Sequence, residues 1–215
     1  MRMNISPAKE NILKKIRQAL TESTPLPFPQ AEGNNSVFPA SLQPLEFEFA
    51  EHFNSLLGKF IYCVNHAEVA AQLQSLVSRQ KWTKVVCNET KLKGLLEKNA
   101  FTDFSDSPLA DCDAAVTTCE ALVARTGSIM MSAAQESGRT VSVYAPVHIC
   151  IASSNQLVYD VKDALQLMKD KYGAKLPSLI TFATGPSRTA DIEKTLVVGV
   201  HGPKEVYCFL VDEEL

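Results

Sequence analysis

Hydrophobic residues along the chain alternate between two patterns. Segments 68–79 and 158–172 carry apolar residues on one helical face, and 47–57 and 92–98 are predicted as further helices. Runs of strand length that are largely apolar interrupt these segments at 60–64, 84–87, 179–183 and 206–211. Strands that are apolar throughout and alternate with helices are typical of a parallel sheet that is covered on both faces. The pattern therefore predicts an α/β fold.

The middle of the chain follows a different pattern. Four short predicted strands follow one another with little helix between them, at 114–117, 128–131, 141–144 and 149–152. Glycine and proline residues separate these strands, as expected for turns. We therefore predict a single three-layer α/β domain over residues 45–215, with a largely parallel sheet that becomes mixed towards its middle.

Two further segments precede this domain. Ser6 and Pro7 are typical of a helix start, and an apolar stripe follows at Ile12, Leu13, Ile16 and Leu20. Residues 1–20 are therefore predicted to form an amphipathic helix, which would bury its stripe against the main domain or against a partner chain. Residues 21–44 contain five prolines and are predicted to be an extended linker.

Composition narrows the classes of function. The 215 residues carry a net charge of −3 with acidic and basic residues interspersed, so a nucleic-acid partner is not expected. No apolar run reaches the length of a membrane span, and the N-terminus lacks the apolar core of a signal peptide, so a cytoplasmic protein is expected.

The cysteines do not predict a cofactor or metal in this chain. None of the six forms a C-x-x-C pair, and four lie inside strand-like apolar runs, where free thiols behave as small hydrophobic groups. Cys112 and Cys119 are the only close pair, and metal binding there is the less favoured alternative. The usual serine-hydrolase, dinucleotide and Walker motifs are absent from the sequence.

One stretch combines several features of an anion site. After the apolar run 179–183, the chain breaks at Thr184, Gly185 and Pro186 and continues with two hydroxyls around a guanidinium, at Ser187, Arg188 and Thr189. A capped helical turn over 191–194 would add free backbone N–H groups. This predicts a seat for a carboxylate or phosphate at a strand end. The alternative is a structural turn in which Arg188 pairs with Asp191 or Glu193.

Candidates for proton transfer lie near other breaks in the pattern. His148 follows Pro146 at a predicted strand start, and His201 lies between Gly199 and Gly202. Either histidine could move a proton or bind a carboxylate, or it could make a structural hydrogen bond. A metal site that joins both histidines to Asp191 or Glu193 is a further, less specific possibility. Glu120 is the best carboxylate candidate for a base or nucleophile.

Several of these stretches resemble the LUD-domain family of lactate-utilization proteins. The resemblance rests on residues 184–193 and 199–204, with supporting matches at 126–128 and 146–149, and it covers roughly 45–211. It implies a fold like that of the CoA-transferase and ribose-isomerase group (NagB/RpiA-like). It also implies a role in oxidising lactate to pyruvate with iron–sulfur partner proteins, which would carry the clusters. The anion stretch and the supporting matches together give the candidate ligand-binding set: Thr126, Gly127, Ser128, Thr184, Gly185, Ser187, Arg188, Thr189, Asp191 and Gly202.

One departure from the family bears on Glu120. In related transferase folds a glutamate in this neighbourhood can form an acyl intermediate. Many family members carry a glutamate just before the strand at 128, whereas this chain has Arg125 there. The change weakens the expectation of glutamate chemistry and would strengthen an anion pocket that Arg125 shares with Arg188.

Three functions therefore remain open from the sequence. The first is a lactate-utilization component that binds a small organic anion. The second is a free-standing transferase or isomerase that acts on an acyl or sugar-phosphate substrate through Glu120. The third is a non-catalytic scaffold whose N-terminal helix recruits partner proteins.

Overall fold

The computed structural model describes residues 7–21, 38, 41–189 and 197–215. The chain divides into two compact units, 1–40 and 41–215. The first unit contains helix α1 (Pro7–Thr21), where the sequence predicted a helix. Most of the predicted linker lies outside the described residues.

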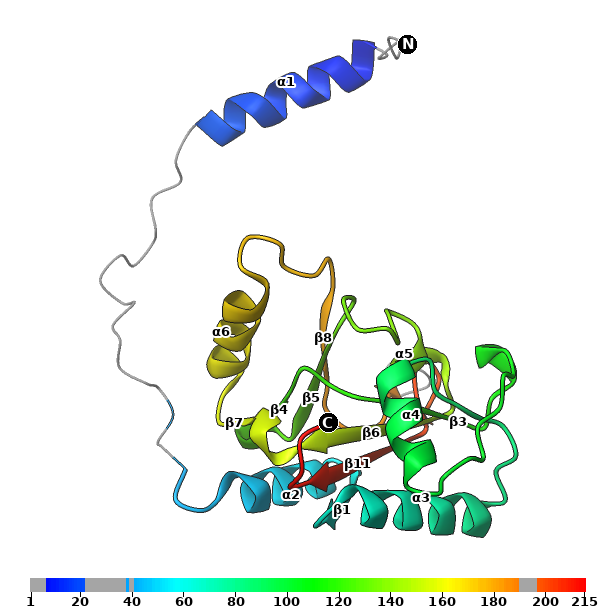
Figure 1. The fold of residues 1–215 in the computed structure, drawn as a ribbon. Helices are drawn as coiled ribbons and strands as arrows, with labels where there is room; N and C mark the ends of the chain where they lie inside the picture. Colours follow the sequence, from blue (N-terminus) through cyan, green and yellow to red (C-terminus); the bar gives the residue numbers. More distant parts are fainter. Residues whose placement is uncertain (1–6, 22–37, 39–40, 190–196) are drawn as a thin grey trace. The chain divides into compact units, whose positions relative to one another are not determined.

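The second unit is built on a parallel sheet of five strands (Figure 1). Its strand order is β1-β11-β6-β3-β2, and every neighbouring pair is parallel. The predicted α/β class with a largely parallel sheet is thereby confirmed. The strands are β1 (Lys59–Cys63), β2 (Val85–Val86), β3 (Ala114–Thr117), β6 (Val147–Ser153) and β11 (Glu205–Val211).

The mixed part of the fold forms a second sheet with the order β7-β4-β5-β8. Strand β5 is antiparallel to both β4 and β8, whereas β4 and β7 are parallel. These strands are β4 (Ala121–Val123), β5 (Ser128–Ser132), β7 (Leu157–Val158) and β8 (Ile180–Ala183). A two-stranded ribbon joins β9 (Arg188–Thr189) to β10 (Val197–Val198).

Helices and short 3-10 turns connect the strands. Side-chain oxygens begin two of the helices: Asn65 accepts a hydrogen bond from the Glu68 N–H at α3, and Asp160 accepts one from the Val161 N–H at α6. The helices are α2 (Leu45–Ser55), α3 (His66–Gln80), α4 (Thr90–Lys98), α5 (Val141–Tyr144) and α6 (Val161–Tyr172). The 3-10 turns are η1 (Leu109–Asp111), η2 (Ala124–Thr126) and η3 (Ser154–Gln156).

One predicted strand is wrong. Residues 141–144 form the short helix α5, in which the Tyr144 N–H donates to the Thr140 carbonyl at 2.9 Å. Val141 is buried in a small cluster with Ala115 and Ala145. Two valines and a tyrosine favour a strand by propensity, but packing of Val141 against β3 decides the local structure.

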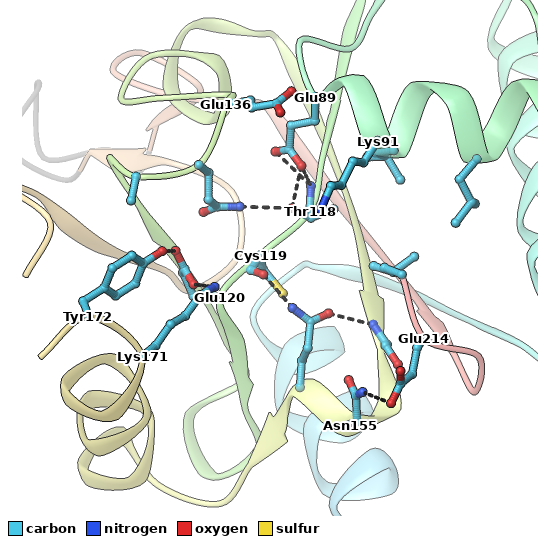
Figure 2. A pocket seen from close by; sticks show the side chains of 17 residues that line it. Glu89, Lys91, Thr118, Cys119, Glu120, Glu136, Asn155, Lys171, Tyr172 and Glu214 are labelled. Atoms are coloured by element: carbon cyan, nitrogen blue, oxygen red, sulfur yellow. Dashed lines mark hydrogen bonds and ion pairs between the residues drawn. The ribbon is translucent and has the colours of Figure 1, made fainter.

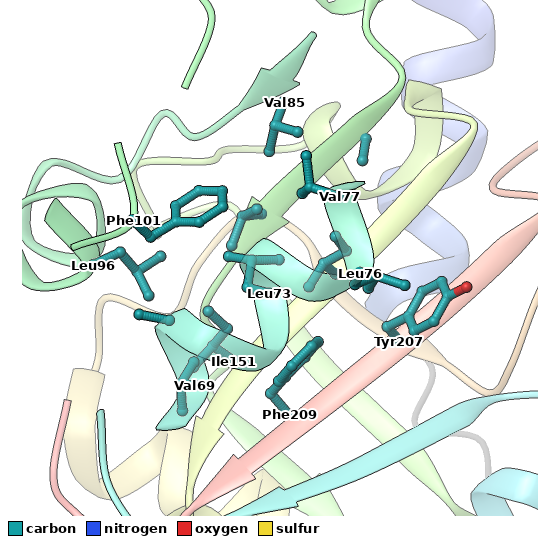
Figure 3. Close-up of a cluster of buried hydrophobic side chains, with 14 of the residues drawn as sticks. Val69, Leu73, Leu76, Val77, Val85, Leu96, Phe101, Ile151, Tyr207 and Phe209 are labelled. Atoms are coloured by element: carbon teal, nitrogen blue, oxygen red, sulfur yellow. The ribbon is translucent and has the colours of Figure 1, made fainter. Parts of the chain in front are cut away.

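The core lies on both faces of the parallel sheet. Alternate residues of β11 point to opposite sides, so Phe209 packs with α3 and α4 whereas Cys208 packs with α2 and the second sheet. Figure 3 shows residues of the first cluster, among them Leu73 and Val77 of α3 and Phe209 of β11. On the far side of the second sheet, Met130 packs against α6. The second sheet is thus buried between the parallel sheet and α6.

Gly127 has a packing role that can be tested against Gly138. Both glycines have left-handed φ values, +57° and +64°, but a Cβ on Gly127 would lie 2.6 Å from the Phe53 backbone nitrogen, whereas one on Gly138 meets nothing within 4 Å. We predict that Gly138→Ala lowers the free energy of unfolding by about 1 kcal/mol. Gly127→Ala should lower it by about 2–4 kcal/mol, because a backbone clash is added. Urea unfolding measures both values, and equal losses would contradict the packing role.

Candidate functional site

A cavity with a volume of about 510 Å³ lies at the carboxyl edge of the parallel sheet (Figure 2). The segments after β2, β3, β6 and β11 all contribute to its lining, together with the start of α4 and the end of α6. Ligands of open α/β sheets bind at this edge, because loops from separate parallel strands converge there. The charged lining residues are Glu89, Lys91, Glu120, Glu136, Lys171 and Glu214.

Glu120 is the most buried charged group of this cavity. Its backbone N–H donates to the Met130 carbonyl at 2.8 Å, which places it between β3 and β4. The carboxylate accepts hydrogen bonds from the Ser132 hydroxyl at 2.6 Å, the Tyr172 hydroxyl at 2.8 Å and the Lys171 ammonium at 2.7 Å. Burial raises the pKa of Glu120, but these three bonds outweigh burial and hold that pKa below its ordinary value.

This environment favours a positioning role for Glu120. Its side chain is 1% exposed, whereas the Lys171 side chain is 55% exposed. The carboxylate already has three donors, so it offers a ligand little room for attack or proton transfer. Its bond to Lys171 outweighs partial burial and raises the pKa of that ammonium, which therefore stays charged. The sequence predicted Glu120 but not Lys171 or Tyr172, because nothing in the chain pattern links the end of α6 to the segment after β3.

Glu89 is a second carboxylate of this cavity that sequence reasoning missed. It precedes α4 and is 7% exposed. The Thr118 hydroxyl donates to Glu89 Oε2 at 2.5 Å, and the Thr118 N–H lies 3.2 and 3.1 Å from the two carboxylate oxygens. Gln135 Nε2 donates in turn to the Thr118 hydroxyl at 3.2 Å. A polar residue that closely follows a buried parallel strand, here β2, was the available signal, since the segments after parallel strands meet at one edge of the sheet.

A smaller cavity of about 390 Å³ lies at the opposite, amino edge of the parallel sheet. His201, Gly202 and Lys204 line it, and none of its described lining residues is acidic. The Ser187 N–H donates to the Pro203 carbonyl at 3.0 Å, and a Cβ on Gly202 would lie 2.9 Å from the Ser187 Cβ. The structure thus brings together His201, Gly202 and Ser187 of the predicted anion site.

The other predicted residues of this stretch lie close by or outside the described part. Arg188 and Thr189 form β9, which pairs with β10, and the Arg188 side chain is exposed. Asp191 and the predicted helical turn 191–194 lie outside the described residues. Strand β8 belongs to the antiparallel part of the second sheet, so its carboxyl end meets the amino edge of the parallel sheet. The carboxyl-edge argument used for this stretch therefore does not apply to it.

Three predicted ligand residues form a chain of hydroxyls elsewhere. Ser128 lies 2.8 Å from the Thr126 hydroxyl and 2.8 Å from the Thr184 hydroxyl, so β5 and β8 are joined where they meet. Gly185 packs on α2, since a Cβ there would lie 2.3 Å from the Leu56 carbonyl oxygen. None of these residues lines either cavity described above.

The sequence suggested an anion pocket that Arg125 shares with Arg188, but neither arginine lines the two cavities described above. The Arg125 guanidinium donates to Asp160 at 2.6 Å, and this bond, which outweighs burial, holds the pKa of Asp160 below its ordinary value. Asp160 also accepts from the Val161 N–H at the start of α6. The arginine therefore ties η2 to α6 by an ion pair.

His148 is fully buried in β6 and lines neither cavity. Its Nε2 lies 2.8 Å from the Thr117 hydroxyl, and that hydroxyl donates to the Thr118 carbonyl at 2.9 Å. Since the hydroxyl has only one proton, we assign the Nε2–H as donor to it. Nδ1 has no hydrogen-bond partner among the described residues. Burial lowers the pKa of His148 to about 4, so the imidazole is neutral at pH 7.

The thiols and carboxylates show no metal site in the described part. No group of three His, Cys, Asp or Glu residues there is placed to hold a metal ion. All six cysteines are free thiols, and Cys112 and Cys119 lie in different buried clusters. Cys119 lines the carboxyl-edge cavity, but contact with Cys150 and burial raise the pKa of its thiol. Among the described helices, none has the length and apolar content of a membrane span.

Comparison with known proteins agrees with the resemblance seen in the sequence. The LUD domain family matches residues 106–211, which confirms that resemblance. Lactate utilization protein C of Bacillus licheniformis is 36% identical over 100 residues, which cover 46% of this chain and 42% of the relative. The protein of that name in Bacillus subtilis is 34% identical over 100 residues. The match thus spans less than half the length of these curated relatives.

Two further comparisons cover more of the chain. An uncharacterized protein of Neisseria meningitidis is 24% identical over 235 residues, which cover 93% of this chain and 91% of that protein. The crystal structure of a DUF162 family protein from Deinococcus radiodurans superposes with a TM-score of 0.60 at 18% identity. It covers 80% of this chain and 99% of that structure, and it supports the fold. The likeness to the CoA-transferase and ribose-isomerase group stays a prediction.

The buried His148 predicts a specific loss of stability in acid. The unfolded chain takes up a proton near pH 6.5, whereas the folded chain does so only near pH 4. Between these values the unfolded state binds more protons than the folded state. The contribution of the neutral His148 to the free energy of unfolding is therefore present in full above pH 6.5 and is lost as the pH falls towards 4. The full loss is about 3 kcal/mol, from about 1.4 kcal/mol per pKa unit.

His148→Asn should remove this contribution, as measured by urea unfolding between pH 7 and pH 4. His201→Asn is the matched control, because His201 is exposed and the slope should survive there. An unchanged slope in His148→Asn would contradict the assignment.

Proposed function

We propose, from the LUD domain match over residues 106–211 and the relatives named lactate utilization protein C, that this protein is a component of a lactate-utilization system. In this role it binds a small organic acid in the carboxyl-edge cavity. The observation that carries the proposal is the ammonium group of Lys171, which lines that cavity and is held by the buried Glu120.

The Lys171 ammonium fits a carboxylate ligand because it is already oriented. Glu120 fixes one side of the ammonium, while more than half of the lysine side chain stays exposed. Ordering a free lysine on binding costs about 0.5–1.5 kcal/mol, and part of that cost is removed here. Lys91 at the start of α4 supplies a second cation to the same lining. A cavity of about 510 Å³ can hold a small organic acid together with water, or a larger organic acid.

The amino-edge cavity is the alternative location for the acid. Its cations are Lys204 and His201, and Arg188 lies on the neighbouring ribbon. These three side chains are exposed, and no ion pair to another described residue orients them. Preorganisation therefore favours Lys171, and the experiment below separates the two locations.

Electron transfer belongs to other proteins in this proposal. Oxidation of lactate releases two electrons, and iron–sulfur partner proteins would receive them, as the family resemblance implies. We place the system in the cytoplasm, where all six cysteines would remain free thiols, as they are in the structure. A free-standing transferase that acts through Glu120 is less favoured, because the Glu120 side chain is only 1% exposed.

Thermal unfolding with lactate, pyruvate, phosphate and coenzyme A tests the proposal. A ligand at about a hundred times its dissociation constant stabilises the folded chain by about 2.7 kcal/mol. We expect this shift with lactate or pyruvate, and we expect Lys171→Gln to remove most of it. The glutamine side chain can still donate to Glu120, so the variant should fold. Lys175→Gln changes an exposed lysine after α6 and is the matched control.

The same thermal unfolding measurement on Arg188→Gln tests whether the acid binds at the amino-edge cavity instead. If Arg188→Gln abolishes the shift while Lys171→Gln keeps it, the acid binds at the amino edge. If no small acid shifts the unfolding of a folded chain, the binding role is wrong.

A further inference from the structure

We propose that Glu89 makes the carboxyl-edge cavity selective for a 2-hydroxy acid over the corresponding 2-keto acid. This inference rests on the proposed function, because it assumes that the acid binds in this cavity. Glu89 would be a specificity-determining residue that contacts the ligand directly. The evidence is the way in which its carboxylate is held, buried and left without a cation.

The Glu89 carboxylate is fixed in place by neutral groups. Thr118 supplies both of its donors, the hydroxyl at 2.5 Å and the backbone N–H at 3.1–3.2 Å. The Thr118 hydroxyl accepts in turn from Gln135 Nε2 at 3.2 Å, so its own proton points towards Glu89. Glu89 is therefore oriented before any ligand arrives.

Glu89 also keeps capacity to accept a further hydrogen bond. A carboxylate has about four acceptor positions, and among the described residues a single neighbour, Thr118, supplies its donors. No ion pair joins Glu89 to a cation among the described residues, in contrast to Glu120, which Lys171 neutralises. The side chain is 7% exposed and lines the cavity. A buried acceptor of this kind gains from a ligand that brings a donor.

The two acids differ in the oxygen on the second carbon, which is the group that would face the Glu89 carboxylate. A 2-hydroxy acid carries an O–H on its second carbon, which can donate to Glu89 while Lys171 or Lys91 pairs with the acid group. A 2-keto acid has only a carbonyl oxygen there, so two acceptors would face each other. Sites that hydrogen-bond a ligand hydroxyl reject analogues without it, because the buried group is then left unpaired.

Changing the acceptor into a group that also donates should remove the preference. Glu89→Gln keeps the size of the side chain, and its amide NH₂ can donate to a carbonyl oxygen. Glu97→Gln, in the last turn of α4, is the matched control, because Glu97 is exposed and does not line the cavity. Thr118→Val is the second variant, which removes the hydroxyl that orients Glu89 but leaves Glu89 itself unchanged.

Titration calorimetry with lactate, pyruvate and propionate measures the effect on the full chain. We expect the unaltered protein to bind lactate at least about tenfold more tightly than pyruvate. The ratio should fall to within about threefold, or invert, in Glu89→Gln, should decrease in Thr118→Val and should persist in Glu97→Gln. Propionate has no 2-substituent and reports the carboxylate contact alone. Its affinity should change less than that of lactate in Glu89→Gln and should fall in Lys171→Gln.

The outcomes separate this inference from the proposed function. If lactate and pyruvate bind equally, or if Glu89→Gln leaves the ratio unchanged, the selectivity role is wrong. Binding that Lys171→Gln weakens would in that case still support the cavity as the site. If none of the three acids binds, both proposals are wrong. If Glu89→Gln does not fold, an unchanged ratio in Thr118→Val overturns the inference by itself.

Discussion

Burial of the parallel sheet on both faces is the constraint on which the rest of the fold depends. Strand β11 lies between β1 and β6 and directs alternate side chains, such as Phe209 and Cys208, into two separate cores. Helices α3 and α4 cover one face. The other face is covered by α2 and the second sheet, and α6 packs against the far side of that sheet. Both faces of the sheet are buried. The polar side chains that could bind a ligand therefore lie at its two edges, where the strands begin and end.

The two edges differ in electrostatic character. At the carboxyl edge four glutamates and two lysines line the larger cavity, and most of these side chains are held by neighbours. At the amino edge Lys204 and His201 line a smaller cavity without any acidic residue among its described lining, and both side chains are exposed. Preorganised charge favours specific recognition, whereas exposed cations supply a general attraction for anions. The difference is the reason for placing the organic acid at the carboxyl edge.

Glu120 and Glu89 show how one residue type takes two roles in one cavity. Glu120 is surrounded by three donors, one of them a lysine, so its charge is used within the protein. Within the described part of the chain, Glu89 receives its hydrogen bonds from the neutral donors of Thr118 and keeps capacity to accept from a ligand. Both follow strands of the parallel sheet, so backbone position alone does not distinguish them. The side chains that α6 and the segment after β3 bring to each carboxylate decide the difference.

Much of the fold could be predicted from the sequence, because periodicity reflects burial directly. The run at 206–211 lies in β11, and the stripe at 158–172 lies in α6 from Val161 on, although Val158 belongs to β7. The family resemblance rests on contiguous motifs, which can be read without the fold. Local propensity misled where packing opposed it, as at 141–144.

The sites depend on contacts between distant segments, which the spacing of residues along the chain does not reveal. Lys171 meets Glu120 across 51 residues, and the motif around Ser187 lies at the amino edge because β8 joined the second sheet. The sequence by itself determined the α/β class and the residues available for chemistry, whereas only the tertiary structure decided which of them share a cavity, because strand order and sheet partner are set by burial of the whole core.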